Sequence, residues 1–133
     1  MPLEGAVPAP SPAAQDLKVF VPAKDFALSK RFYRALGWRL DWEEGDVAQL
    51  ELAGVRFLLQ NPFEPIWASC FAIHIRVPDA EAWARHARAL AAGDFPGTKV
   101  EGPREESWGF RVAYVWDPSG VLLHFAEPLP RPL

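Results

Sequence analysis

Two histidines, His74 and His124, are the side chains in this chain best suited to acid–base chemistry. Imidazole titrates near neutrality, so such a pair could accept and donate protons at working pH. No third residue that would orient them is evident from the spacing, so the favoured interpretation is two cleft histidines without a catalytic duty. A non-standard metal site completed by Gln60 is a weaker alternative.

Four cationic side chains could bind an anionic ligand: Lys18, Arg56, Arg76 and Arg111. The guanidinium fork matches the paired oxygens of a carboxylate or a phosphate. The competing interpretation is ordinary ion pairing across the surface of a sheet. The charge set therefore predicts an anion-binding cleft as one of two open alternatives.

Strand alternation determines which of these side chains share a face. The inward set predicted in this way is Lys18, Phe20, Gln49, Arg56, Leu58, Gln60, His74, Arg76, Arg111, Ala113, Val115, Leu122 and His124. None of these residues is acidic, which predicts a cationic cleft, neutralised by a ligand or by an acid such as Glu51 or Glu127 at its rim. Trp108, beside Gly109, is expected at the cleft mouth, where it either stacks on a planar ligand or packs as a lid.

The elements that must position these residues occur in the same order twice. Each half reads as strand, helix, strand, strand, strand, which indicates an internal duplication. The predicted helices run from Asp25 to Leu36 and from Asp79 to Leu90, with aspartates as N-caps and glycines after the ends. The predicted boundaries are a flexible arm at 1–15, a first module at 16–62, a second module at 70–128 and a tail at 129–133.

The bulk composition is that of a small globular protein of 133 residues, half of them apolar. A net charge of −3 gives no reason to expect nucleic acid as a partner. One cysteine, Cys70, excludes an internal disulfide framework and suits a reducing compartment. With no signal peptide and no apolar run near the roughly 20 residues that span a bilayer, we expect a cytoplasmic location and no membrane.

Three local patterns occur in a family-specific order. Val21-Pro22-Ala23-Lys24-Asp25-Phe26 is followed by Ser29, Phe32-Tyr33 and Leu36-Gly37; Arg76-Val77-Pro78-Asp79 opens the second half; and Trp108-Gly109-Phe110-Arg111 precedes Asp117-Pro118-Ser119-Gly120. Together, over residues 16–128, they resemble the vicinal-oxygen-chelate superfamily of glyoxalases, bleomycin-resistance proteins and dioxygenases. The resemblance implies an α+β fold in which two tandem βαβββ modules form a curved mixed sheet around a cleft, and a homodimer.

The metal-ligand positions of that superfamily correspond here to Lys18, Leu58, Ala72 and His124, of which only His124 is a good ligand. The resemblance therefore implies a protein without metal or other cofactor that binds a small compound, and the inward cations and Trp108 predict that this compound is anionic or aromatic. The alternative is an enzyme of the lyase, isomerase or dioxygenase type that uses His124 and His74 with a non-standard metal or none. A protein-binding regulatory or immunity role is a third possibility.

Overall fold

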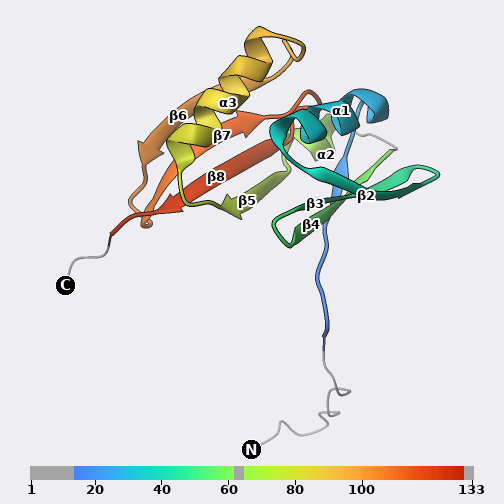
Figure 1. The fold of residues 1–133 in the computed structure, drawn as a ribbon, viewed down its shortest axis with the longest axis horizontal. Coiled ribbons are helices and arrows are strands. Elements are labelled where there is room, and N and C mark those ends of the chain that lie inside the picture. The colour runs from blue at the N-terminus through green and yellow to red at the C-terminus, as the bar shows by residue number, and fades with distance from the viewer. Residues whose placement is uncertain (1–13, 62–64, 131–133) are drawn as a thin grey trace, which may run out of the picture.

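The computed structural model describes residues 14–61 and 65–130, and its elements follow the predicted order (Figure 1). The first half holds β1 (Phe20–Pro22), α1 (Phe26–Leu36), β2 (Arg39–Glu44), β3 (Val47–Leu52) and β4 (Val55–Gln60). The second half holds β5 (Ala72–Arg76), α3 (Ala80–Ala92), β6 (Lys99–Glu105), β7 (Phe110–Trp116) and β8 (Leu122–Pro128). A short helix that the sequence analysis did not predict, α2 (Pro65–Ser69), lies between them. The duplicated βαβββ order is confirmed.

Each half builds its own four-stranded sheet with the same topology. The strand order is β1-β4-β3-β2 in the first sheet and β5-β8-β7-β6 in the second. In each, the first strand runs parallel to the last, and the other pairs are antiparallel. The α+β class is confirmed, and the two sheets remain separate rather than joining into one closed barrel.

The helices begin where the sequence predicts. The Asp25 side chain accepts a hydrogen bond from the Leu28 amide at 3.0 Å, and the Asp79 side chain accepts one from the Ala82 amide at 3.1 Å. Gly37 follows α1 at φ 126°, in the region that favours glycine. No helix in the described ranges is both long enough and apolar enough to cross a membrane.

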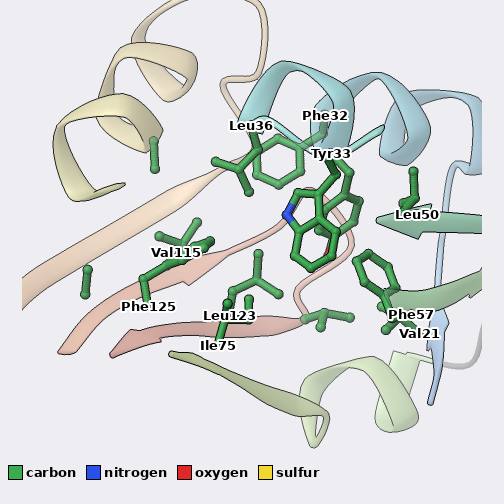
Figure 2. Close-up of a cluster of buried hydrophobic side chains, with 14 of the residues drawn as sticks. Val21, Phe32, Tyr33, Leu36, Leu50, Phe57, Ile75, Val115, Leu123 and Phe125 are labelled. Carbon is green, nitrogen blue, oxygen red and sulfur yellow. The ribbon is translucent and has the colours of Figure 1, made fainter. Parts of the chain in front are cut away.

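One hydrophobic core joins the two halves through α1 (Figure 2). On this helix Phe32 packs edge-on against Phe95 of the second half, with ring centres 5.6 Å apart. Tyr33 packs against Phe57 of the first half at 5.0 Å. The helix therefore contacts both halves, and their relative position is fixed by tight aromatic packing.

A buried hydrogen bond also crosses between the halves. The Tyr33 hydroxyl donates to Asp117 Oδ2 at 2.6 Å, while Asp117 Oδ1 accepts from the amides of Ser119 and Val121 at 2.8 and 3.0 Å. Burial raises the pKa of Asp117, and the hydrogen bonds from Tyr33 and the amides oppose that rise. The carboxylate thus connects residues within the β7–β8 loop to one another and connects the loop to α1.

We expect Tyr33→Phe to lower the free energy of unfolding by about 1.5–3 kcal/mol at pH 7, the usual range for a hydrogen bond to a charged group. The loss should shrink as the pH falls toward 4, since Tyr33 favours the ionised Asp117 and protonation removes the charge. The titration of Asp117 itself has the opposite pH dependence to the Tyr33 hydrogen bond. Because the pKa of Asp117 is raised in the folded state, its contribution to stability is complete below the unfolded value of ~3.9 and is lost as the pH rises through the folded pKa.

Urea unfolding of both proteins between pH 7 and 4 measures this prediction. The matched control is Arg34→Ala, which alters an exposed residue on the same helix. An equal loss for Tyr33→Phe at every pH would show that the hydroxyl does not act through the Asp117 carboxylate.

Candidate functional site

The open face of the second sheet gathers most of the chemically distinctive side chains. His74 of β5 and Tyr114 of β7 are both register partners of His124 on β8, so the three share one row. The same face carries an apolar cluster built on Val112, Tyr114 and Ala126, against which Phe110, Trp116 and Leu122 pack. The opposite face lies in the common core, with Leu123 and Phe125. The face that helix α3 does not cover is therefore aromatic and rich in nitrogen.

The prediction that Arg111, Ala113 and Val115 share the face of His124 is wrong. Trp116 pairs with Leu122, so the connecting loop runs from Asp117 to Val121, one residue longer than the turn that the sequence suggested. A one-residue shift moves every side chain of a strand to the other face. Arg111 instead lies opposite Glu127 and forms ion pairs with Glu105 and Glu127 at 3.1 and 3.7 Å.

Five rings form a continuous surface on this face. The ring centre of His74 lies 5.1 Å from Phe110 and 5.9 Å from both Trp108 and His124. Tyr114 contacts His124 edge-on at 4.9 Å. Trp108, from the loop after β6, is 50% exposed, so its ring is available to a ligand.

Charged groups border these rings. Arg76 lies over the Phe110 ring at 5.9 Å and Arg104 over the Tyr114 ring at 4.3 Å. The Tyr114 hydroxyl donates to Glu106, whose carboxylate also pairs with Arg104 at 3.6 Å. Arg76 has no acidic partner within residues 14–61 and 65–130, and together with Glu106 and Trp108 it lines a pocket of about 270 Å³. Arg76 is therefore the cation on this face that remains available to an anion.

The first sheet also has an open face, and there the predicted alternation is confirmed. Gln49 pairs with Leu58, which in turn pairs with Phe20, and Val47 pairs with Gln60. Trp42 continues the row of Gln49 onto β2. Phe20 and Trp42 are each 45% exposed, so this face presents uncovered aromatic surface.

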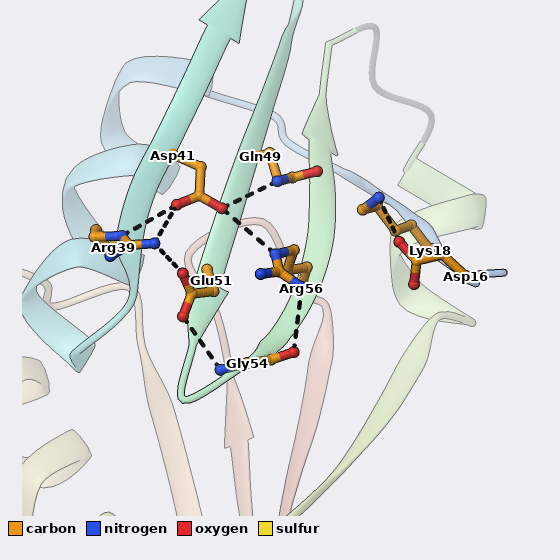
Figure 3. A network of polar contacts seen from close by, with 8 residues as sticks. All are labelled: Asp16, Lys18, Arg39, Asp41, Gln49, Glu51, Gly54 and Arg56. Carbon is orange, nitrogen blue, oxygen red and sulfur yellow. Dashed lines mark hydrogen bonds and ion pairs between the residues drawn. The ribbon is translucent and has the colours of Figure 1, made fainter.

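The prediction of a face without carboxylates is wrong for this sheet (Figure 3). Arg56 pairs directly with Glu51 in register. Asp41 accepts hydrogen bonds from Arg39 at 2.8 Å and from Gln49 at 3.0 Å, and lies 3.7 Å from Arg56. The hydrogen bonds from Gln49 and then Arg39 hold the pKa of Asp41 below its ordinary value. The pairing of β2 with β3 is irregular between Leu40 and Trp42, and Asp41 lies at this irregularity. Alternation of side chains alone does not predict that Asp41 shares this face.

Lys18 is likewise paired, with Asp16 at 2.6 Å. Lys18, Arg39 and Arg56 thus form ion pairs with acids of the same half, as the more ordinary interpretation of the sequence supposed.

The predicted site residues do not meet in one hollow within the described chain. A groove of about 260 Å³ between β4 and β5 brings Arg56 and His74 onto common walls, together with apolar residues such as Leu17 and Val55. The others divide by sheet: Lys18, Phe20, Gln49 and Gln60 belong to the first half, and Arg76, Trp108 and His124 to the second. Sequence reasoning missed Phe110 and Tyr114, since the correct loop length was needed to place β7, and with them Arg104 and Glu106, which contact Tyr114.

The four positions that the resemblance assigns to a metal do not fit one. Leu58 and Ala72 offer no lone pair, and the Lys18 ammonium is bound to Asp16. Across the described residues, no group of three or more His, Cys, Asp and Glu side chains is arranged to hold a metal ion. A standard three- or four-ligand site is therefore not formed by these side chains.

Comparison with known proteins identifies the fold. No family model and no curated protein matches the sequence. Among solved structures, a bleomycin-binding protein from Streptomyces verticillus, complexed with copper(II)-bleomycin, matches at 26% identity and a TM-score of 0.71, over 86% of this chain and 98% of that one. An antibiotic binding protein from Streptomyces sp. matches at 22% and 0.71, over 87% and 98%. A lactoylglutathione lyase from Agrobacterium tumefaciens matches at 18% and 0.63, over 86% and 94%.

The protonation of His124 provides a test of the site geometry. Partial burial lowers the pKa of His124, the neighbouring His74 lowers it further, and Glu106 opposes both effects. In His74→Ala we expect the pKa of His124 to rise toward its ordinary value, while the remaining burial keeps it below that value. Imidazole proton shifts followed by NMR across pH 4–8 measure both. His86→Gln, on α3, serves as the control and should leave His124 unchanged; a pKa of His124 that does not move in His74→Ala would contradict the close pairing.

Proposed function

Since the chain has the vicinal-oxygen-chelate fold, which it shares with bleomycin-resistance proteins and lactoylglutathione lyase, we propose that it is a small-molecule binding protein whose ligand lies on the open face of the second sheet. The observation that carries the proposal is the continuous surface of five rings around His74 and His124, with Trp108 half-exposed at its edge. Uncovered aromatic surface of this kind favours a planar ligand, because stacking adds to the free energy of apolar burial.

Arg76 gives the ligand its second property. Its guanidinium has no acidic partner in the described part of the chain, and it borders the pocket that Trp108 also lines. A carboxylate, sulfonate or phosphate group on the ligand would supply the missing partner in a bidentate contact. The ligand class is therefore a planar aromatic compound with one anionic group. Binding of this kind does not depend on a metal at the superfamily's ligand positions.

One solved neighbour is a bleomycin-binding protein and another is an antibiotic binding protein, and this supports a binding role on the same scaffold. An acid–base enzyme is the second candidate, since the rings of His74 and His124 lie only 5.9 Å apart. Neither imidazole is oriented by a carboxylate hydrogen bond within the described ranges, which favours binding over catalysis.

Two fluorescent probes that differ by one anionic group test the ligand class. The anionic probe is 1-anilinonaphthalene-8-sulfonate, and the neutral one is N-phenyl-1-naphthylamine. We expect Trp108→Ala to weaken both by about tenfold, through loss of roughly 1.5 kcal/mol of stacking. Arg76→Ala should weaken the sulfonate by a similar factor and leave the neutral probe unchanged, because only the sulfonate pairs with the guanidinium.

The control for these titrations is Arg85→Ala, which removes an exposed arginine on α3, the helix that packs on the opposite face of the second sheet. If Arg76→Ala weakened the affinity for both probes equally, the proposal that the ligand carries an anionic group would be contradicted. Unchanged affinity in Trp108→Ala would remove the ring surface as the binding site.

We also propose that the binding cleft is completed by a second copy of the chain. The first sheet leaves Phe20 and Trp42 each 45% exposed, and the second leaves Trp108 50% exposed, so both open faces present aromatic surface that a single chain does not cover. Apolar surface gathered in this way commonly marks an interface. Placing the first sheet of one copy opposite the second sheet of its partner would bring Gln49 and Gln60 toward the face of His124.

Light scattering after size exclusion should therefore give twice the chain mass of 14.8 kDa. Trp42→Asp should shift the protein toward monomer by introducing a charge that must be desolvated at the interface. Arg85→Asp, an equally drastic change on the exposed side of α3, should remain dimeric. A monomer at every concentration of the unaltered protein would end this part of the proposal.

A further inference from the structure

The pocket that Arg76 and Trp108 line also contains an acid, Glu106, for which the proposed anionic ligand offers no partner. Arg76 reaches this pocket of about 270 Å³ from β5, whereas Glu106 follows directly on β6, in the loop that carries Trp108. The two charged side chains do not form an ion pair with each other. Opposite charges that border one small pocket without touching leave room for a ligand that carries both signs.

Glu106 is held in place by both its backbone and its side chain. Its amide donates a hydrogen bond to the Phe110 carbonyl oxygen at 2.8 Å, and its own carbonyl oxygen accepts one from the Gly109 amide at 3.2 Å. In the side chain, Oε2 accepts a hydrogen bond from the Tyr114 hydroxyl and lies 3.6 Å from Arg104 Nε. The carboxylate is therefore positioned before a ligand arrives, which lowers the entropic cost of binding.

These contacts do not satisfy the whole carboxylate. Within the described part of the chain, Oε1 of Glu106 accepts no hydrogen bond, since the bond from Tyr114 goes to Oε2. Arg104 is shared with a second acid, Glu101, whose Oε1 lies 4.0 Å from its guanidinium, so its charge is divided between two carboxylates. The Glu106 side chain is only 24% exposed. A mostly buried carboxylate with an oxygen that accepts no hydrogen bond favours a cationic partner.

We propose that the ligand carries a protonated amine as well as its anionic group, so that it is an aromatic zwitterion of the amino acid type, and that Glu106 selects for the amine. This inference rests on the proposed function, because it adds a second charged group to the same ligand. Arg76 binds the carboxylate, Glu106 Oε1 accepts a hydrogen bond from the ammonium, and the aromatic ring lies against Trp108. A pocket just below the usual range of roughly 300–1,000 Å³ suits one ring system with two small charged groups.

Three indole compounds separate the two charges of the ligand: L-tryptophan carries both groups, indole-3-propionate lacks the amine, and tryptamine lacks the carboxylate. In isothermal titration calorimetry of the full chain at pH 7, we expect tryptophan to bind about tenfold more tightly than either of the others. Glu106→Gln should remove the advantage of tryptophan over indole-3-propionate and leave the affinity for indole-3-propionate unchanged. The reason is that glutamine loses the charge but keeps an acceptor oxygen for the Tyr114 hydroxyl.

The matched control is Glu105→Gln, which alters the adjacent acid, a partner of Arg111 that does not line the pocket, and should keep the full preference for tryptophan. Equal affinity of the unaltered protein for tryptophan and indole-3-propionate would overturn this inference and leave the proposed function intact, since an aromatic carboxylate still binds. An equal loss of both compounds in Glu106→Gln would also overturn it, because the acid would then only support Tyr114 and the ring surface. If neither indole-3-propionate nor the sulfonate probe bound at all, the proposed function would be contradicted and this inference with it.

Discussion

The buried carboxylate of Asp117 is the constraint on which the arrangement of the candidate site depends. Its two oxygens accept hydrogen bonds from the amides of Ser119 and Val121 and from the Tyr33 hydroxyl. The amide bonds hold the loop between β7 and β8 at its observed length, and that length sets the register. The register in turn places Tyr114, rather than Arg111, beside His124. A single desolvated acid thus decides the chemistry of a face whose residues lie on other strands.

The same interaction links the site to the rest of the fold. Through Tyr33 the carboxylate holds α1, whose aromatic residues pack against both halves of the core. An ionised group is costly to bury and is retained where several donors surround it. Here the donors come from the loop of one half and from the helix of the other. The geometry of the loop and the relative position of the halves are therefore coupled.

Much of this fold could be predicted from the sequence because its signals are local. Asp25 and Asp79 mark the helix starts as caps, and the alternating β3–β4 hairpin places Gln49, Arg56 and Gln60 on one face, as predicted. The prediction for Arg111 is wrong because the β7–β8 loop is one residue longer than the Asp117-Pro118-Ser119-Gly120 turn suggests, and hydrogen bonds from the amides of Ser119 and Val121 to Asp117 hold it at that length. The charge of the first face is predicted wrongly because Asp41 lies at an irregularity in the pairing of β2 with β3. Strict alternation of side chains along a strand does not reveal such an irregularity.

The two halves share a topology and differ in how their open faces satisfy their charges. The open face of the first half carries a network of ion pairs among Arg39, Arg56, Asp41 and Glu51. Because these charges neutralise one another, they do not need a charged ligand as a partner. In the second, rings occupy the centre of the face and Arg76 lacks an acidic partner among the described residues. Self-paired charge stabilises a surface, whereas an unpaired guanidinium beside exposed rings is more favourable when a ligand covers it. Duplication has therefore supplied one face suited to support and one suited to recognition, and the asymmetry rests on which acids lie within reach of which arginines.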